Sequence, residues 1–129
     1  MSSFNAVVSD KAPAAIGPYS QAIKVNGMVY TSGVIPLDPA SGEVVGDDIS
    51  AQAERVFQSL SALLADADAS MGSVVKTTCF LQDLNDFATF NEIYARYFDG
   101  DTTPARSTVQ VAKLPKGVLV EVEAVAVAG

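Results

Sequence analysis

The sequence predicts an α+β fold in which two helices pack on one face of a mixed β-sheet. Three observations lead to this prediction. The chain opens with three β-rich segments, continues with two helical segments separated by a strand, and closes with two further strands. Helices gathered on one face of a sheet bury the apolar surfaces of both in one core. A chain of 129 residues is sized for one domain, which we expect to span residues 1–129.

The first three strands are predicted at residues 4–9, 20–25 and 28–32. Asn26 and Gly27 separate the last two of them. Both central residues of a two-residue type I′ turn need a positive φ, which asparagine and glycine accept. The sequence therefore predicts a β-hairpin that turns at Asn26-Gly27.

Two segments repeat their apolar residues at helical spacing. The first covers residues 51–68 and follows three capping candidates, Asp47, Asp48 and Ser50. The second follows residues 83–86 and carries a stripe of aromatic side chains. The stripe consists of Phe87, Phe90, Tyr94, Tyr97 and Phe98. We interpret this stripe as core rather than as a cofactor site.

The remaining strands are predicted at residues 74–82, 107–112 and 118–127, with the first of them central in the sheet. Since successive strand residues point to opposite faces, the last strand has one wholly apolar face. Its other face carries Glu121 and Glu123 between apolar ends. A desolvated glutamate has a raised pKa, which suits it to acid–base work. A glutamate in solvent, or one in a structural ion pair, is the alternative.

Arg106 follows a Thr-Pro-Ala segment and directly precedes a predicted strand, where it shares a face with Thr108. Proline stiffens this approach, and a guanidinium held in place can bind a carboxylate through two parallel hydrogen bonds. An ordinary surface arginine is the alternative. Because we expect the strands of Arg106 and Glu121 to be neighbours, we predict that these two residues form one site.

Other residues have a functional and a structural interpretation. Tyr19 ends a rigid loop, where it either lines a pocket or plugs the end of the sheet. Ser32 and Gly33 end a strand, where they either contact a ligand or make a turn. Asn91 is either a ligand contact or a helix-surface amide. Cys79 is interpreted as a small buried apolar residue.

The composition excludes several kinds of site. Without histidine there is no Ser-His-Asp or Cys-His site and no zinc site built on imidazole, and one cysteine excludes an internal disulfide. The net charge of −7, without a basic cluster, argues against a nucleic-acid partner. We expect neither a metal nor an organic cofactor. A hydrophobic content of 49% in so small a chain favours an oligomer.

The first thirteen residues lack the charged start and apolar stretch of a signal peptide. No apolar run is long enough to cross a membrane. We therefore expect a cytoplasmic protein without a membrane partner.

Seven short stretches of the chain form one pattern: residues 14–22 (AAIGPYSQA), 31–36 (TSGVIP), 75–78 (VKTT), 83–87 (DLNDF), 104–107 (PARS), 114–117 (LPKG) and 120–126 (VEVEAVA). Taken together, these stretches resemble the RidA family of reactive intermediate deaminases. They occur in the order and at the spacing of the family over nearly the whole chain. This combination is specific, although no single stretch is decisive.

The resemblance implies a fold like that of bacillus-type chorismate mutase, assembled as a homotrimer with active sites between subunits. It implies hydrolysis of 2-iminopropanoate and 2-iminobutanoate to 2-oxo acids and ammonia, as a form of metabolite damage control. These imines arise when pyridoxal-phosphate dehydratases act on serine and threonine.

Carried over residue by residue, the resemblance implies that Arg106 holds the substrate carboxylate and that Glu121 activates the attacking water. It implies that Tyr19 lines the cleft. Polar contacts to the substrate are assigned to Ser32, Gly33, Asn91 and Thr108. Many relatives have a cysteine where Thr108 stands, so thiol-based regulation at this position is in doubt.

Two other functions remain open. An arginine in a cleft between subunits also suits a binding module or sensor for 2-oxo acids that performs no chemistry. Some relatives are described as ribonucleases, but the net charge of −7 and the missing histidine argue against this activity.

Overall fold

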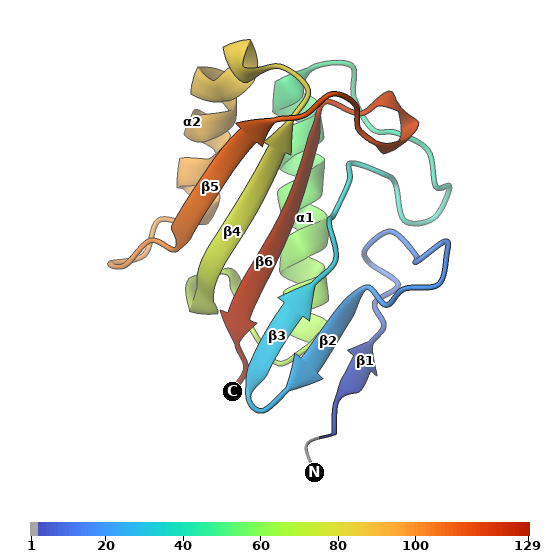
Figure 1. Ribbon diagram of the computed structural model, residues 1–129, viewed down its shortest axis with the longest axis vertical. Helices are drawn as coiled ribbons and strands as arrows, with labels where there is room; N and C mark the ends of the chain where they lie inside the picture. The colour runs from blue at the N-terminus through green and yellow to red at the C-terminus, as the bar shows by residue number, and fades with distance from the viewer. Residues whose placement is uncertain (1–2) are drawn as a thin grey trace.

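The computed structural model of the chain describes residues 3–129 and contains one six-stranded sheet. Both helices lie on the same face of this sheet (Figure 1). The strands are β1 (Asn5–Val7), β2 (Ala22–Val25), β3 (Met28–Thr31), β4 (Val74–Leu81), β5 (Ala105–Gln110) and β6 (Val120–Val127). The helices are α1 (Ile49–Asp66) and α2 (Phe87–Tyr97), with short 3-10 turns η1 (Met71–Ser73), η2 (Leu84–Asp86) and η3 (Pro115–Gly117). The predicted fold class and element order are confirmed.

The hairpin between β2 and β3 is confirmed at the predicted turn. Asn26 has a φ of 50° and Gly27 a φ of 76°, as a type I′ turn requires. The two strands pair antiparallel from Val25 and Met28 outward. A purely local signal therefore fixes the register of this part of the sheet.

The sheet is mixed, with the strand order β1-β2-β3-β6-β4-β5. β5 pairs in parallel with β4, whereas β6 pairs antiparallel with both β3 and β4. The expectation that the strands of Arg106 and Glu121 are neighbours is therefore wrong, because β4 lies between them. The β4–α2–β5 crossover sets β5 on the outer side of β4, and β6 then returns to the gap beside β3.

Each strand also differs from its predicted boundaries by one or two residues at one end or both, and the differences at β5 and β6 concern the candidate site. β5 begins at Ala105, which pairs with Lys76, so Arg106 lies within the strand rather than before it. β6 begins at Val120, three residues after the end of η3, in which Lys116 lies in the left-handed region at a φ of 57°.

The core lies between the helices and the face of the sheet that they cover. Phe57 of α1 is fully buried, and its ring centre lies 5.1–5.9 Å from four aromatic rings. These rings belong to Phe90, Tyr94, Tyr97 and Phe98. Most of the predicted aromatic stripe is thus core, as expected. The wholly apolar face of β6 is buried in the same core.

The other face of the sheet is covered by neither helix (Figure 1). Alternation along the strands places mostly apolar side chains on it. They include Tyr30, Val109 and Val127, which are 47%, 43% and 45% exposed. We refer to this surface as the open face. Within residues 3–129, no helix is long and apolar enough to cross a membrane.

Asp48 is the capping residue of α1, and its side chain accepts a hydrogen bond from the Ala51 N–H at 2.9 Å. We predict that Asp48→Ala lowers the free energy of unfolding by about 1 kcal/mol, because an N–H of the first turn loses its partner. Urea denaturation at a fixed protein concentration measures this loss. Asp47→Ala removes an equal charge one residue earlier and is the control. Equal effects of the two variants would contradict the assignment of the cap.

Candidate functional site

Arg106 lies on β5, one of the two edge strands of the sheet, and its side chain packs against α2. Its Nη1 donates a hydrogen bond to Asn91 Oδ1 at 2.7 Å. Its guanidinium carbon lies 4.6 Å from the ring centre of Tyr94 and 5.4 Å from that of Phe87. Both ion pairs found within residues 3–129 involve other side chains. An amide and two rings thus orient this cation without neutralising it.

Thr108 follows Arg106 on the same face of β5 and lies opposite Cys79 of β4. Its hydroxyl oxygen is buried and has no hydrogen-bond partner in the described part of the chain. The Val111 N–H donates to the Leu81 carbonyl of β4 at 2.9 Å. Because N–H groups alternate in direction along a strand, the N–H of Thr108 points to the free edge of β5. A strand N–H beside a guanidinium suits a carboxylate ligand.

Cys79 is fully buried, as the sequence predicted. Burial raises the pKa of its thiol to about 11. The thiol therefore stays protonated near neutral pH, and a nucleophilic role is unsuited to it.

Glu121 projects from β6 onto the open face, where it pairs across the strands with Phe80 of β4. Its carboxylate packs directly on Gly33. A Cβ atom at Gly33 would overlap Glu121 Oε2, so any side chain at this position would displace the Glu121 carboxylate. Reciprocal backbone hydrogen bonds between Val34 and Val122, at 2.8 and 3.1 Å, hold the two segments together.

Burial raises the pKa of Glu121, and the nearby charge of Glu123 raises it further. Both causes disfavour the ionised form. The sequence argument, which placed this carboxylate on a partly apolar face, therefore predicted the correct direction of the shift. A glutamate with a raised pKa is a stronger base than one in solvent.

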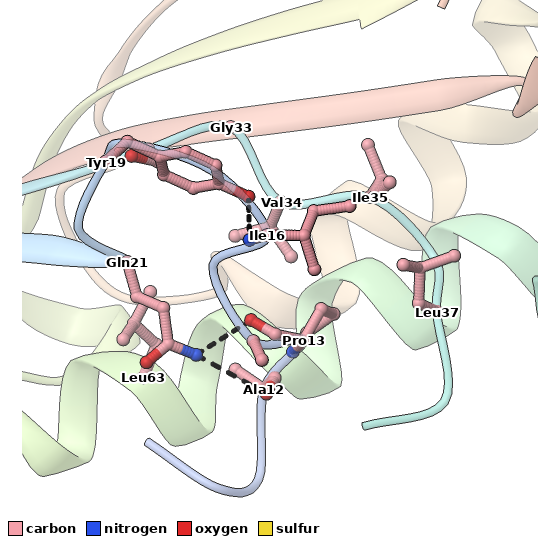
Figure 2. A pocket seen from close by; sticks show the side chains of 12 residues that line it. Ala12, Pro13, Ile16, Tyr19, Gln21, Gly33, Val34, Ile35, Leu37 and Leu63 are labelled. Carbon is pink, nitrogen blue, oxygen red and sulfur yellow. Dashed lines mark hydrogen bonds between the residues drawn. The ribbon is translucent and has the colours of Figure 1, made fainter. Parts of the chain in front are cut away.

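Tyr19, Ser32 and Gly33 line one pocket between their two loops, to which α1 contributes Leu63 (Figure 2). The Ser32 hydroxyl donates a hydrogen bond to the Ser20 carbonyl at 2.7 Å, so its proton is already engaged. The Tyr19 side chain is half exposed. The pocket therefore presents an aromatic ring and a polar backbone over a mostly apolar lining.

The predicted residues form two groups. The Arg106 group consists of Arg106, Asn91 and Thr108. The Glu121 group consists of Tyr19, Ser32, Gly33 and Glu121. Arg106 and Glu121 project from opposite faces of the sheet on strands that β4 separates. The two groups therefore do not form one site within a protomer.

Sequence reasoning missed residues that support each group. Phe87 and Tyr94 hold Arg106, and their spacing from Asn91, four residues before and three after, was the available signal for a shared helix face. Gln21 orders the loop that carries Tyr19. Its buried amide accepts a hydrogen bond from the Ser9 N–H at 2.8 Å and donates one to the Pro13 carbonyl at 2.7 Å. No sequence signal indicated this role for Gln21.

Within residues 3–129 there is no group of three or more side chains suited to hold a metal ion. The Arg106 and Glu121 groups offer an unneutralised guanidinium, a carboxylate with a raised pKa and backbone N–H groups. This set suits binding of a carboxylate ligand together with proton transfer to or from water.

Residues 9–128 match the protein family described as Endoribonuclease L-PSP. A mouse protein named 2-iminobutanoate/2-iminopropanoate deaminase is 49% identical over 123 residues, which cover 95% of this chain and 90% of that protein. A Salmonella typhimurium protein of the same name is 49% identical over 123 residues, covering 94% and 95%. A crystal structure described as E. coli TdcF with bound serine has a TM-score of 0.91 at 45% identity, covering 97% and 99%. The resemblance predicted from the sequence is confirmed.

We predict that the Glu121 carboxyl titrates above the usual range of glutamate, with a midpoint that falls in Glu123→Gln. The substitution removes the charge that opposes ionisation of Glu121, while the effect of burial remains. Carbon-13 NMR of labelled glutamate carboxyl groups, assigned with Glu121→Gln, measures both midpoints. An unchanged midpoint in Glu123→Gln would show that burial acts alone.

Proposed function

The chain belongs to the Endoribonuclease L-PSP family, and on this premise we propose that it hydrolyses 2-iminopropanoate and 2-iminobutanoate to 2-oxo acids and ammonia. The observation that carries the proposal is the unneutralised Arg106 at the free edge of β5. The names of the mouse and Salmonella relatives give the substrate class. The bound serine of the E. coli relative supports a site for small amino-acid-like molecules in this fold.

In the proposed complex, Arg106 binds the substrate carboxylate. Asn91 occupies Nη1, and the remaining guanidinium donors stay free for two parallel hydrogen bonds. The N–H of Thr108 on the same edge supplies a further donor. A carboxylate fixed in this way sets the distance between the imine carbon and the attacking water.

Glu121 supplies the base. Water attacks the protonated imine carbon as Glu121 accepts a proton, which gives a carbinolamine. Glu121 then returns the proton to nitrogen. The C–N bond breaks as Glu121 accepts the hydroxyl proton and the carbonyl forms, and this proton passes to the departing ammonia. The net reaction converts one protonated imine and one water into a 2-oxo acid and an ammonium ion. The side chains of this chain perform each step, without a cofactor.

The remaining residues shape the site. Tyr19 closes one side of the pocket in Figure 2 with its half-exposed ring. Because Gly33 has no side chain, the Glu121 carboxylate packs in the space that the Cβ atom of a larger residue would occupy. Ser32 contributes its hydroxyl oxygen as an acceptor, since its proton is engaged by Ser20.

The proposed active unit is a homotrimer, in which the Arg106 group of one subunit meets the Glu121 group of the next. Two observations support this arrangement. Arg106 and Glu121 project from opposite faces of the sheet in one protomer. The open face also carries apolar side chains that a subunit interface would cover, among them Tyr30, Val109 and Val127.

The proposed setting is the cytoplasm, where the protein would remove reactive imines as metabolite damage control.

A non-catalytic 2-oxo acid sensor is the second candidate, and saturable binding without turnover would favour it. The name of the family favours a test of ribonuclease activity. The net charge of −7 opposes contact with a phosphate backbone.

We predict that the wild-type protein removes both imines, generated in situ by an amino-acid oxidase or dehydratase. Semicarbazide traps the imine that remains, so the trapped product falls in proportion to the protein added. Arg106→Ala and Glu121→Ala each restore the trapped product while the circular dichroism stays native. Near-wild-type turnover by folded Arg106→Ala would refute the proposed function.

We predict that two inactive variants restore activity when they assemble together. Arg106→Ala and Glu121→Ala subunits, refolded in equal amounts, are expected to show about a quarter of the wild-type rate, since each mixed trimer has one intact site. Each variant refolded alone is the control and stays inactive. A mixture that assembles into mixed trimers yet remains inactive would contradict a site shared between subunits.

A further inference from the structure

We propose that Tyr94 is a positioning residue for Arg106, and that the buried Thr77 hydroxyl holds the Tyr94 ring in the orientation that this requires. The consequence for substrate binding rests on the proposed role of Arg106 as the carboxylate anchor. The consequence for the mobility of Arg106 does not.

The three side chains form a closed set of contacts. Thr77 of β4 is the direct register partner of Arg106 on β5. The Thr77 Oγ1 and the Tyr94 hydroxyl are hydrogen-bonded at 2.8 Å. The Tyr94 ring centre in turn lies 4.6 Å from the Arg106 guanidinium carbon. The pairing of β4 with β5 therefore fixes the position of Arg106 and also that of Thr77, which hydrogen-bonds the Tyr94 ring that Arg106 contacts.

The hydroxyl pair lies inside an aromatic core. Thr77 is 0% exposed and Tyr94 is 7% exposed. Valine in place of Thr77 and phenylalanine in place of Tyr94 would fill nearly the same space and would bury no hydroxyl group that needs a hydrogen-bond partner. The Tyr94 hydroxyl oxygen lies on the long axis of the ring, so the hydrogen bond fixes the direction of this axis, which apolar packing alone specifies less strictly. The pair thus adds an orientation that burial does not provide.

The electrostatics fit positioning rather than proton transfer. Burial raises the pKa of Tyr94, so its hydroxyl stays neutral near neutral pH. A neutral ring attracts the guanidinium through its π face and leaves the full charge of Arg106 available to an anion. A carboxylate in the same place would hold Arg106 as firmly but would neutralise it.

Arg106 needs this support because it stands on an outer strand. Its long side chain would otherwise sample many rotamers in solvent. Asn91 holds Nη1 and Phe87 lies against the guanidinium at 5.4 Å, and both come from the same face of α2 as Tyr94. Three residues of one helix thus restrict Arg106, and Tyr94 is the nearer of the two rings.

The test measures the mobility of the Arg106 side chain and substrate affinity in the intact oligomer. Nitrogen-15 relaxation of the Arg106 Nε–H group, assigned with Arg106→Lys, reports mobility without any ligand. The KM and kcat for imine hydrolysis, and the Kd of 2-oxobutanoate, report affinity. The variants are Tyr94→Leu, which removes the ring, and Tyr94→Phe, which keeps it.

Tyr94→Leu is expected to make the Arg106 Nε–H group mobile and to raise KM and Kd about fivefold with kcat little changed. Tyr94→Phe keeps the ring but loses the hydrogen bond to Thr77, so its KM and Arg106 mobility are expected to fall between those of Tyr94→Leu and the wild type. Tyr97→Leu is the matched control, since Tyr97 lies on the same helix but hydrogen-bonds Glu54. Should Tyr94→Leu fail to fold, Thr77→Val is expected to raise KM and Arg106 mobility, whereas Thr77→Ser retains the wild-type values.

A rigid Arg106 in folded Tyr94→Leu, or an equal rise of KM in Tyr97→Leu, would overturn the inference. A mobile Arg106 in Tyr94→Leu, in a protein whose wild type neither hydrolyses imines nor binds 2-oxobutanoate, would support positioning and refute the proposed function instead. The two failures are therefore distinguishable.

Discussion

The parallel pairing of β4 with β5 is the constraint on which the rest of the structure depends. Parallel neighbours need a connection that crosses a face of the sheet, and α2 provides it. The crossover leaves β5 as an outer strand and lays α2 against it. Arg106 thereby gains aromatic and amide partners from α2 and keeps an open edge on its other side. One topological requirement thus produces both the support of the guanidinium and its accessibility.

The same topology separates the two halves of the proposed site. Strand residues alternate between faces, and β6 turns its apolar residues to the core and Glu121 to the open face. Arg106 projects from the face that the helices cover, and its strand, β5, is separated from β6 by β4. Rearranging one protomer to join them would require a one-residue register shift, which would also expose the buried face of β6. A second subunit would complete the proposed site without disturbing the core, and the apolar open face is the surface that such an assembly would bury.

Local sequence signals predicted what local physics determines. The turn at Asn26-Gly27 and the aromatic stripe of α2 follow from short-range geometry and are confirmed, and the cap is Asp48, one of the three predicted candidates. The position of β4 between β5 and β6 is a non-local property, because nothing within either strand specifies its neighbour. The sequence therefore placed Arg106 and Glu121 beside each other wrongly. For the same reason it identified Tyr94 as core but not as the support of Arg106.

The charges of the protein fit a small anionic substrate better than a large one. A net charge of −7 repels a polyanion, whereas a single fixed guanidinium can bind one carboxylate at short range against this field. The repulsion between Glu121 and Glu123 has a use in the same setting, because it raises the pKa of the proposed base. A base whose pKa lies closer to neutrality accepts a proton from water more readily. Repulsion between like charges thus underlies both the unfavourable field that a polyanion meets and the raised pKa of Glu121.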